Sequence, residues 1–169
     1  MFVLNNTLKC IYLFAILTRI MYVCALFLVI VCMVYLTRRE RFNSAHRLFN
    51  AGLSDDENYQ LYGKCANPNW HGHNYELFVT VKGKIDSETG VIINLKELSQ
   101  IIMTKIIDKV DHKNLNIEVD FLKDKIVSTE NIVMAIWKEL EPELNKTNAR
   151  LHKIRLVETE NNFAEYYGE

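Results

Sequence analysis

The clearest pattern in the chain is an alternation of apolar and polar side chains along residues 73–83. Its apolar positions are Tyr75, Leu77, Val79 and Val81. A two-residue period over this length is typical of a strand with one buried face. Residues 39–47 are also predicted to be extended, which places Phe42, Ser44 and His46 on one side.

Shorter runs predict the other strands. Residues 85–90 (IDSETG) have the composition of a turn and lead into a short return strand at 91–93. Residues 150–158 are predicted to be a strand, and a turn at 161–162 joins them to a last strand at 163–167.

Two segments show apolar residues at helical spacing after a capping signature. Asn94, with Glu97 three residues later, is predicted to start a helix that ends near residue 110. Ser128 is predicted to start a second helix that stops near Pro142, because proline interrupts the helical hydrogen bonds.

The remaining element is a short helix, predicted from the capping box of Ser54 and Glu57 and ending near Tyr62. The element order indicates an α+β domain, in which helices cover one face of an antiparallel sheet. The other face of the sheet also needs cover, so we expect the chain to assemble with copies of itself.

The first 36 residues differ from the rest. Residues 20–36 contain no charge, and the length of this run is at the short end of the range for a membrane-spanning helix. Residues 10–18 are also apolar. We therefore predict an apolar helix in residues 1–36 and a separate domain at 37–169. One alternative is a membrane anchor through residues 8–36, with Arg38, Arg39 and Arg41 keeping the domain in the cytosol. The other is an upstream extension that is absent from the working protein.

Composition excludes several classes of protein. Apolar residues make up 49% and charged residues 24%, which argues against a disordered chain. The net charge of −1 argues against a nucleic-acid-binding protein. Of the four cysteines, only Cys65 lies in residues 37–169, so no disulfide can form within that domain. A reducing compartment, the cytoplasm, is therefore expected.

Three histidines are candidate metal ligands. His71 and His73 flank Gly72, and on an extended chain their side chains project to the same side about 6–7 Å apart. His46 lies on another predicted strand, within reach if the two strands are neighbours. Three imidazoles without a fourth protein ligand are typical of a catalytic zinc site with an open position. By itself, the His-x-His pair is more often found in a surface turn than at a metal.

Cys65 leaves two interpretations open. It could be the fourth ligand of a closed structural zinc site, or a thiolate beside an open one. The Asp111–His112 pair is either an oriented acid–base group or a solvated helix end. Glu158 shares an apolar face with Ile154 and Leu156, so we expect it to pair with a cation or a ligand.

Four ordered motifs resemble the 6-pyruvoyl-tetrahydropterin synthase family. They are residues 65–75 (CANPNWHGHNY), 111–115 (DHKNL), 128–131 (STEN) and 158–162 (ETENN). The resemblance extends from about residue 35 to residue 169. It implies the tunnelling fold, in which a four-stranded antiparallel sheet carries two helices on one face and trimers stack in pairs into hexamers.

The resemblance also implies an activity. Family members are zinc-dependent lyases that convert 7,8-dihydroneopterin triphosphate into 6-pyruvoyl-tetrahydropterin and release triphosphate, in tetrahydrobiopterin biosynthesis. By position in the motifs, His46, His71 and His73 match the zinc ligands, and Cys65 matches the general base.

The remaining motif residues match the other roles in the family. Asp111 and His112 match the partners of the acid–base relay. Glu158 matches the carboxylate that anchors the pterin, and Thr129 and Glu130 match the segment that lines its pocket.

The chain departs from the family pattern at three places. Trp70 stands where a small residue such as glycine is expected, Ser128 stands where threonine is usual, and the apolar N-terminus is foreign to the family. Two other functions compete with the synthase. One is the related 6-carboxy-tetrahydropterin synthase, and the other is a non-catalytic, membrane-tethered zinc module with Cys65 as fourth ligand.

Overall fold

The computed structural model describes residues 33–169, and the predicted apolar helix of residues 1–36 falls almost wholly outside them. The element order is β1 (Val34–His46), α2 (Asp55–Tyr62), η1 (Gly63–Ala66), β2 (His71–Gly83), α3 (Leu95–Ile102), η2 (Met103–Ile107), α4 (Asp108–Val110), β3 (Lys113–Asn114), η3 (Asp120–Leu122), α5 (Thr129–Leu144), β4 (Arg150–Val157) and β5 (Phe163–Tyr166). Residues 34–36 belong to β1, so the prediction of an apolar helix that extends to residue 36 is wrong at its C-terminal end. No helix in residues 33–169 has the length and apolar character needed to cross a bilayer.

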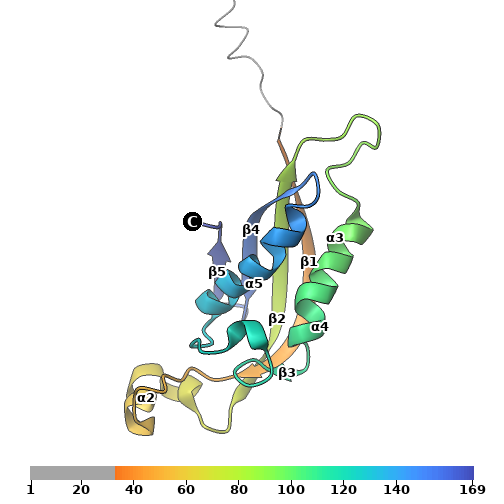
Figure 1. The fold of residues 1–169 in the computed structure, drawn as a ribbon. Helices are drawn as coiled ribbons and strands as arrows, with labels where there is room; N and C mark the ends of the chain where they lie inside the picture. Colours follow the sequence, from red (N-terminus) through yellow and green to blue (C-terminus); the bar gives the residue numbers. More distant parts are fainter. Residues whose placement is uncertain (1–32) are drawn as a thin grey trace, which may run out of the picture. The chain divides into compact units, whose positions relative to one another are not determined.

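One sheet in the order β3-β1-β2-β4-β5 forms the frame of the domain (Figure 1). The long strands β1 and β2 pair antiparallel from Val34↔Gly83 to His46↔His71. β4 pairs antiparallel with β2, and β5 pairs antiparallel with β4. The expected antiparallel sheet is therefore present.

The number of strands differs from the expectation of four. β3 is a fifth, two-residue strand that runs parallel to β1 at its end. Its flanking amides of His112 and Leu115 donate to the carbonyl oxygens of Asn43 and Ala45 at 2.6 and 2.9 Å. Two residues are too few to show an alternating pattern, so this strand could not be predicted from periodicity.

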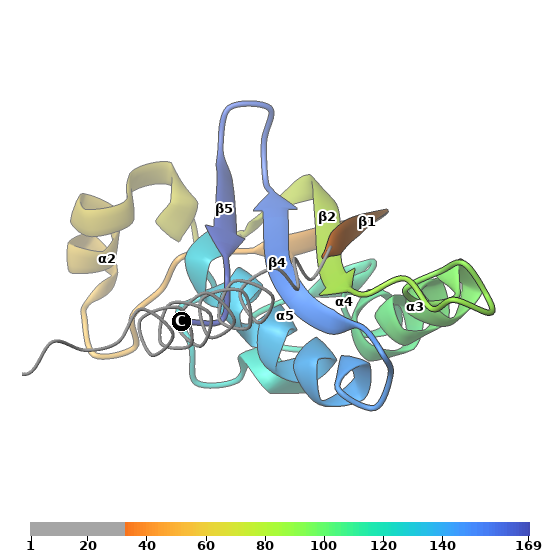
Figure 2. The same cartoon turned by 90° about the horizontal axis from the view of Figure 1, so that it is seen from above.

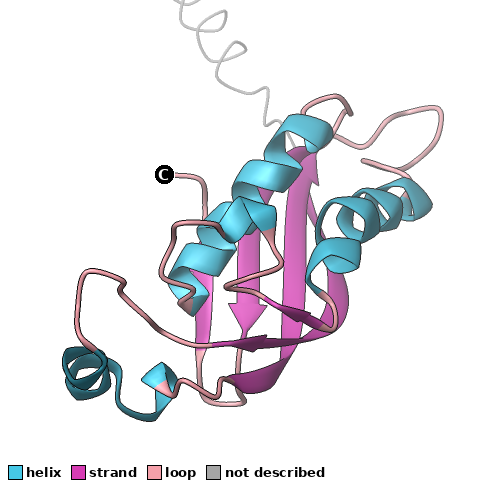
Figure 3. Cartoon of the chain, turned by 60° about the horizontal axis from the view of Figure 1, so that its bottom comes forward, coloured by secondary structure: helices cyan, strands magenta, loops and turns pink. Residues whose placement is uncertain are grey.

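Both long helical segments cover the same face of the sheet, as Figures 2 and 3 show. Alternate residues of β2 point into the core beneath them: Tyr75, Leu77, Val79 and Val81 are completely buried. The Asn94 side chain caps α3, and the Ser128 hydroxyl caps α5 by accepting from the Asn131 amide. The predicted helix over 95–110 is observed, with a π-helical turn at η2.

Two local predictions are wrong. Residues 91–93 do not form a strand; Ile92 and Ile93 instead bury their side chains from an irregular segment. α5 also continues past Pro142 to Leu144. A proline in the last turn removes only one hydrogen bond, and the apolar face of the helix still packs against the sheet.

Candidate metal centre and pterin pocket

The three candidate histidines meet where β1 ends and β2 begins. His46 is the last residue of β1, and its register partner is His71, the first residue of β2. His73 follows two residues later on the same face. The ring centroids lie 4.6 Å apart for His46 and His71, 5.1 Å for His46 and His73, and 5.0 Å for His71 and His73. The strand pairing therefore gathers all three imidazoles.

Gly72 permits the close approach of the two strands at this point. A Cβ atom at Gly72 would lie 3.2 Å from the carbonyl oxygen of Ser44, which is tighter than an ordinary contact. The absence of a side chain between His71 and His73 therefore lets the β1 backbone lie close to the His-x-His segment.

The nitrogen atoms of the triad fit a metal ion. One ligand nitrogen from each histidine lies within 4.8 Å of the other two. The Nδ1 atom of His46 donates to the carbonyl oxygen of Val127 at 2.8 Å, which leaves its Nε2 atom as the free acceptor. This Nε2 atom and the Nδ1 atom of His71 are buried without a hydrogen-bond partner. Buried acceptors of this kind are satisfied when they coordinate a metal.

Burial favours the neutral form of two of these imidazoles, against the opposing charge of Glu158. Burial lowers the pKa of His46, and the neighbouring His71 and His73 lower it further, against the opposing effect of the Val127 carbonyl. Burial and His73 likewise lower the pKa of His71. Because only a neutral imidazole can coordinate a metal, the site is prepared for one near neutral pH.

Glu158 lies beside the triad, directly after the end of β4. Its Oε1 atom is 3.5 Å from the His46 Nε2 atom and 3.9 Å from the His73 Nε2 atom. The Thr129 hydroxyl, at the first residue of α5, donates to the same oxygen at 2.9 Å. The carboxylate is thus oriented by α5 and placed at the metal side of a pocket.

That pocket has a volume of about 380 Å³ and collects most of the predicted site residues. It is lined by His46, Leu48, Cys65, Ser128, Thr129, Glu130, Glu158, Asn161, Asn162, Phe163 and Ala164. Its walls come from β1, η1, the start of α5 and the turn between β4 and β5. Residues far apart in the sequence therefore form one cavity with charged and polar groups on its walls.

Cys65 lies on the wall of this pocket but not in the metal cluster. It is an exposed free cysteine in η1, and its carbonyl oxygen accepts from the Leu48 amide at 2.8 Å. It also lines a second hollow together with His71 and His73. Among residues 33–169, the cluster within metal-binding distance contains the three histidines alone. This geometry favours a thiol beside an open metal position over a closed four-ligand site.

Asp111 and His112 form a pair at a different place. The Asp111 carboxylate accepts from the His112 ring at 2.9 Å and from the Asn43 amide at 2.8 Å, and the Asn43 bond is the main cause of its lowered pKa. The His112 side chain is 77% exposed. It lines a hollow with Asn43 and His73, not the pocket of Cys65. Within a single chain, Asp111 and His112 therefore do not line the same pocket as Cys65.

Trp70 does not line the pocket. It has a backbone φ of 65°, and its ring lies against the guanidinium of Arg47 at 4.9 Å. Neither cavity that Cys65 lines includes Trp70. The tryptophan at this position therefore changes the support of the site rather than the lining of the cavity.

Four contributors to the site were missed at the level of sequence. The Val127 carbonyl carries no side-chain signal at all. Asn162 closes the 158–162 motif and Phe163 begins a predicted strand, but neither was given a role in the site, yet both line the pocket. Tyr75 has a buried hydroxyl without a partner, and burial raises its pKa. The HGHNY motif contains Tyr75, but its alternation with Leu77 indicated only a core position.

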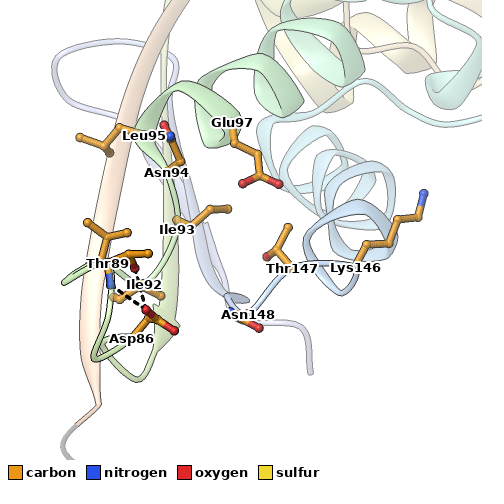
Figure 4. Close-up of a pocket in the computed structure, with 11 residues that line it drawn as sticks. Asp86, Thr89, Ile92, Ile93, Asn94, Leu95, Glu97, Lys146, Thr147 and Asn148 are labelled. Atoms are coloured by element: carbon orange, nitrogen blue, oxygen red, sulfur yellow. Dashed lines mark hydrogen bonds between the residues drawn. The ribbon is translucent and has the colours of Figure 1, made fainter.

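A separate hollow of about 730 Å³ lies at the other end of the sheet (Figure 4). The segment after β2, the start of α3 and the residues after α5 form its walls. The carboxylate of Asp86 is used locally, because it accepts from the amide and hydroxyl of Thr89. None of the predicted site residues lines this hollow.

Comparisons with known proteins agree with this geometry. Residues 35–169 match the family model described as 6-pyruvoyl tetrahydropterin synthase. The 6-pyruvoyl tetrahydrobiopterin synthase of Dictyostelium discoideum is 46% identical over 136 residues, which cover 80% of this chain and 97% of the relative. The human enzyme of the same name is 43% identical over 138 residues, covering 82% and 94%.

Solved structures give the same result. The 6-pyruvoyl tetrahydropterin synthase of Caenorhabditis elegans is 34% identical, with a TM-score of 0.75 and coverage of 81% of this chain and 96% of that one. The Plasmodium falciparum protein, at 20% identity and a TM-score of 0.52 over 80% and 98%, supports the fold alone. The chain belongs to the 6-pyruvoyl tetrahydropterin synthase family of enzymes.

Proposed function

We propose that this chain is a zinc-dependent lyase that converts 7,8-dihydroneopterin triphosphate into 6-pyruvoyl-tetrahydropterin, with release of triphosphate, in tetrahydrobiopterin biosynthesis. The single observation that carries the proposal is the gathering of three histidine nitrogens within 4.8 Å beside a pocket that holds a carboxylate and a thiol. Family membership supplies the substrate class.

His46, His71 and His73 would hold the zinc ion. Their imidazole ligands match the preference of zinc for nitrogen at about 2.0–2.1 Å. Once bound, zinc would act as a Lewis acid that lowers the pKa of the hydroxyls on the substrate side chain and acidifies the adjacent C–H bonds. The absence of Cys65 from the cluster supports an open coordination position.

Cys65 is the proposed general base. Its exposed thiol lines the pocket that contains Glu158 and also the hollow that contains His71 and His73, so it faces both ends of a bound substrate. A base in this position removes a proton from the substrate side chain and allows it to be returned at another atom. No external hydride donor is needed, because the pterin ring gains its hydrogens from within the substrate.

Glu158 is the proposed anchor of the pterin ring. A carboxylate can accept two parallel N–H bonds from the 2-amino-pyrimidine edge of a pterin, a strong charge-assisted contact. Thr129 already orients one of its oxygens, and Glu130 lines the same pocket. A ligand without those donors would leave the carboxylate unpaired, so the contact selects for pterins.

Asp111 and His112 are the proposed relay partners of Cys65, supplied by another copy of the chain. Within one chain the pair is exposed and lines a different hollow from Cys65. Within residues 33–169, β5 and most of β1 also have no strand partner on one side, since β3 pairs only with Ser44 and Ala45 of β1. We propose a hexamer built from two trimers, in the cytoplasm.

A product assay tests the proposed function. The protein is incubated with 7,8-dihydroneopterin triphosphate in the presence of zinc, and the pterin product is identified by mass spectrometry together with the metal content of the protein. We expect 6-pyruvoyl-tetrahydropterin and about one zinc ion per chain. Formation of 6-carboxy-tetrahydropterin would assign the chain to the related enzyme instead, and absence of any turnover with zinc bound would favour a non-catalytic zinc module.

A further inference from the structure

Arg47 is stacked between two aromatic rings next to the metal centre. Its guanidinium carbon lies 4.1 Å from the ring centroid of Phe49 and 4.9 Å from that of Trp70. A guanidinium held over aromatic faces at these distances is attracted by the negative charge density of the rings. We call the three residues Arg47, Phe49 and Trp70 the aromatic clamp.

The clamp continues the strand pair that carries the metal ligands. His46 and His71 are the last register partners of β1 and β2. Arg47 follows His46 directly, and Trp70 precedes His71 directly, so the next pair along the ladder would be Arg47 and Trp70. The backbone pairing of β1 and β2 stops at the histidines. One residue further on, the side chains of Arg47 and Trp70 connect the two segments.

Two features show that the clamp is held in place. The Asn116 side chain binds both main-chain groups of Arg47, accepting from its amide and donating to its carbonyl oxygen at 3.0 Å each. The Nε atom of Arg47 is buried without a hydrogen-bond partner, and none of the ion pairs within residues 33–169 includes Arg47. Within the described residues, the rings of Phe49 and Trp70 are therefore the contacts that the structure shows for its guanidinium.

Trp70 occupies a backbone conformation that disfavours its own side chain. Its φ of 65° lies in the left-handed region, where a bulky residue is strained and glycine is not. A tryptophan remains in such a conformation only when its surroundings hold it there. The Trp70 amide donates to the carbonyl oxygen of Asn67 at 3.0 Å, and the guanidinium of Arg47 is the side-chain contact that holds the ring.

We propose that the aromatic clamp fixes the separation of His46 and His71 before the metal binds, and thereby sets how tightly the centre holds its ion. Arg47, Phe49 and Trp70 are thus positioning residues that act through the two neighbouring ligands. This inference rests on the proposed metal site. It goes beyond the proposed function because it assigns the affinity of the centre to residues that touch neither metal nor substrate.

The test separates metal affinity from stability. The metal-free protein is titrated with Zn²⁺ against a chromophoric chelator, and its thermal unfolding is followed in parallel. Trp70→Gly is expected to weaken zinc binding by about tenfold, the lower end of the effect of residues that orient metal ligands. The same change relieves the strained φ, so the melting temperature of the metal-free protein should not fall. A purely structural tryptophan would instead lower the melting temperature.

Conservative and coupled variants complete the design. Trp70→Phe keeps an aromatic face and should restore most of the zinc affinity, and Co²⁺ absorption spectra should distinguish Trp70→Gly from both proteins. Arg47→Lys keeps the charge but loses the planar stack, so it should weaken binding as Trp70→Gly does. If the clamp acts as a unit, the double variant should be no weaker than either single variant.

Tyr167→Leu is the matched control. It removes a cation–aromatic contact with Lys153, whose Nζ atom lies 5.9 Å from the ring centroid, near the end of the sheet opposite the histidines. Its zinc affinity should equal that of the parent. Parent-like zinc affinity in Trp70→Gly would overturn the clamp and leave the proposed function standing. Failure of the parent itself to bind zinc would overturn the proposed metal site, and with it the clamp.

Discussion

His46 is held by a backbone carbonyl on one side of its ring and is open on the other. The bond to Val127 requires the proton to sit on Nδ1, and this fixes the tautomer that presents Nε2 to a metal. The same residue is only 2% exposed, so a charge on its ring would be costly. Burial therefore favours the neutral form of the ring, and the hydrogen bond to Val127 fixes its orientation.

This burial predicts a pH dependence of stability in the metal-free protein. The pKa of His46 is lowered from its ordinary value of 6.5 in the folded state, so below pH 6.5 the unfolded chain binds more protons than the folded one. The free energy of unfolding should fall as the pH drops below 6.5, as measured by urea denaturation. His46→Gln should flatten this slope, and an unchanged slope in that variant would contradict the role given to His46.

Cys65 gives a second prediction at the residue scale. Cys65→Ala should retain zinc, because its thiol lies outside the histidine cluster, and should lose turnover, because the proposed base is gone. Metal content by plasma emission and product formation by mass spectrometry measure the two effects separately. Loss of zinc in Cys65→Ala would mean that the sulfur is a fourth ligand.

Glu158 is predicted to control pterin affinity without controlling the metal. Glu158→Gln removes the charge but keeps the shape, and loss of a charge-assisted hydrogen bond costs about 2 kcal/mol, or roughly thirtyfold in affinity. Calorimetry with a non-reactive pterin measures this change. The exposed Glu160, two residues later, provides the control variant Glu160→Gln, which should bind as the parent does. Equal affinities for the two variants would remove Glu158 from the anchor role.

At the scale of elements, the two serine-capped helices have different surroundings. The Ser128 cap starts α5, whose apolar face lies in the core with Ile132, Ile136 and Leu140 completely buried. The Ser54 capping box starts α2, which buries only Asn58. The same local signal therefore begins one helix of the core and one peripheral helix.

This difference predicts different effects of the same substitution. Ser128→Ala should lower the free energy of global unfolding by about 1 kcal/mol, the usual cost of losing a cap. Ser54→Ala should fray α2 and leave global unfolding nearly unchanged, because α2 can open without disturbing the core. Denaturant unfolding reports the first effect, and amide hydrogen exchange of residues 55–62 reports the second. An equal loss of global stability in both variants would contradict this assignment.

At the scale of the whole molecule, the single chain leaves its functional parts apart. The His112 ring is 77% exposed, and it lines a hollow other than the pocket of Cys65. In the part of the chain that the structure describes, the sheet also has edges without a strand partner, which are open to pairing with further copies. Assembly would join the relay to the thiol and would cover these edges.

We therefore expect the protein to behave as a hexamer in solution. Light scattering of residues 33–169 should give six times the mass of one chain, and His112→Ala should keep this mass while lowering turnover. Mixing Cys65→Ala chains with His112→Ala chains should give more activity than either variant alone, since some sites then contain both groups. A monomeric protein with full activity would exclude a relay shared between copies.

Local patterns in the sequence determined most of the helices and strands. Strict alternation marked β2, paired capping residues marked the helix starts, and His71-Gly72-His73 marked two candidate ligands. These signals are short-range, because side-chain direction in a strand and hydrogen bonding at a helix end depend on neighbouring residues. β3 was not predicted, and the strand predicted at 91–93 is not observed. Segments of two or three residues are too short to show a reliable period.

By contrast, only the tertiary structure decided which residues meet. The register of β1 against β2 places His46 opposite His71, and the turn after β4 brings Glu158 to the rings of His46 and His73. The Val127 carbonyl that fixes the His46 tautomer has no counterpart in the sequence pattern, since every residue carries a carbonyl. The physical reason is that long-range contacts depend on strand register and packing, whereas the sequence by itself specifies which chemical groups are available and in which local conformation.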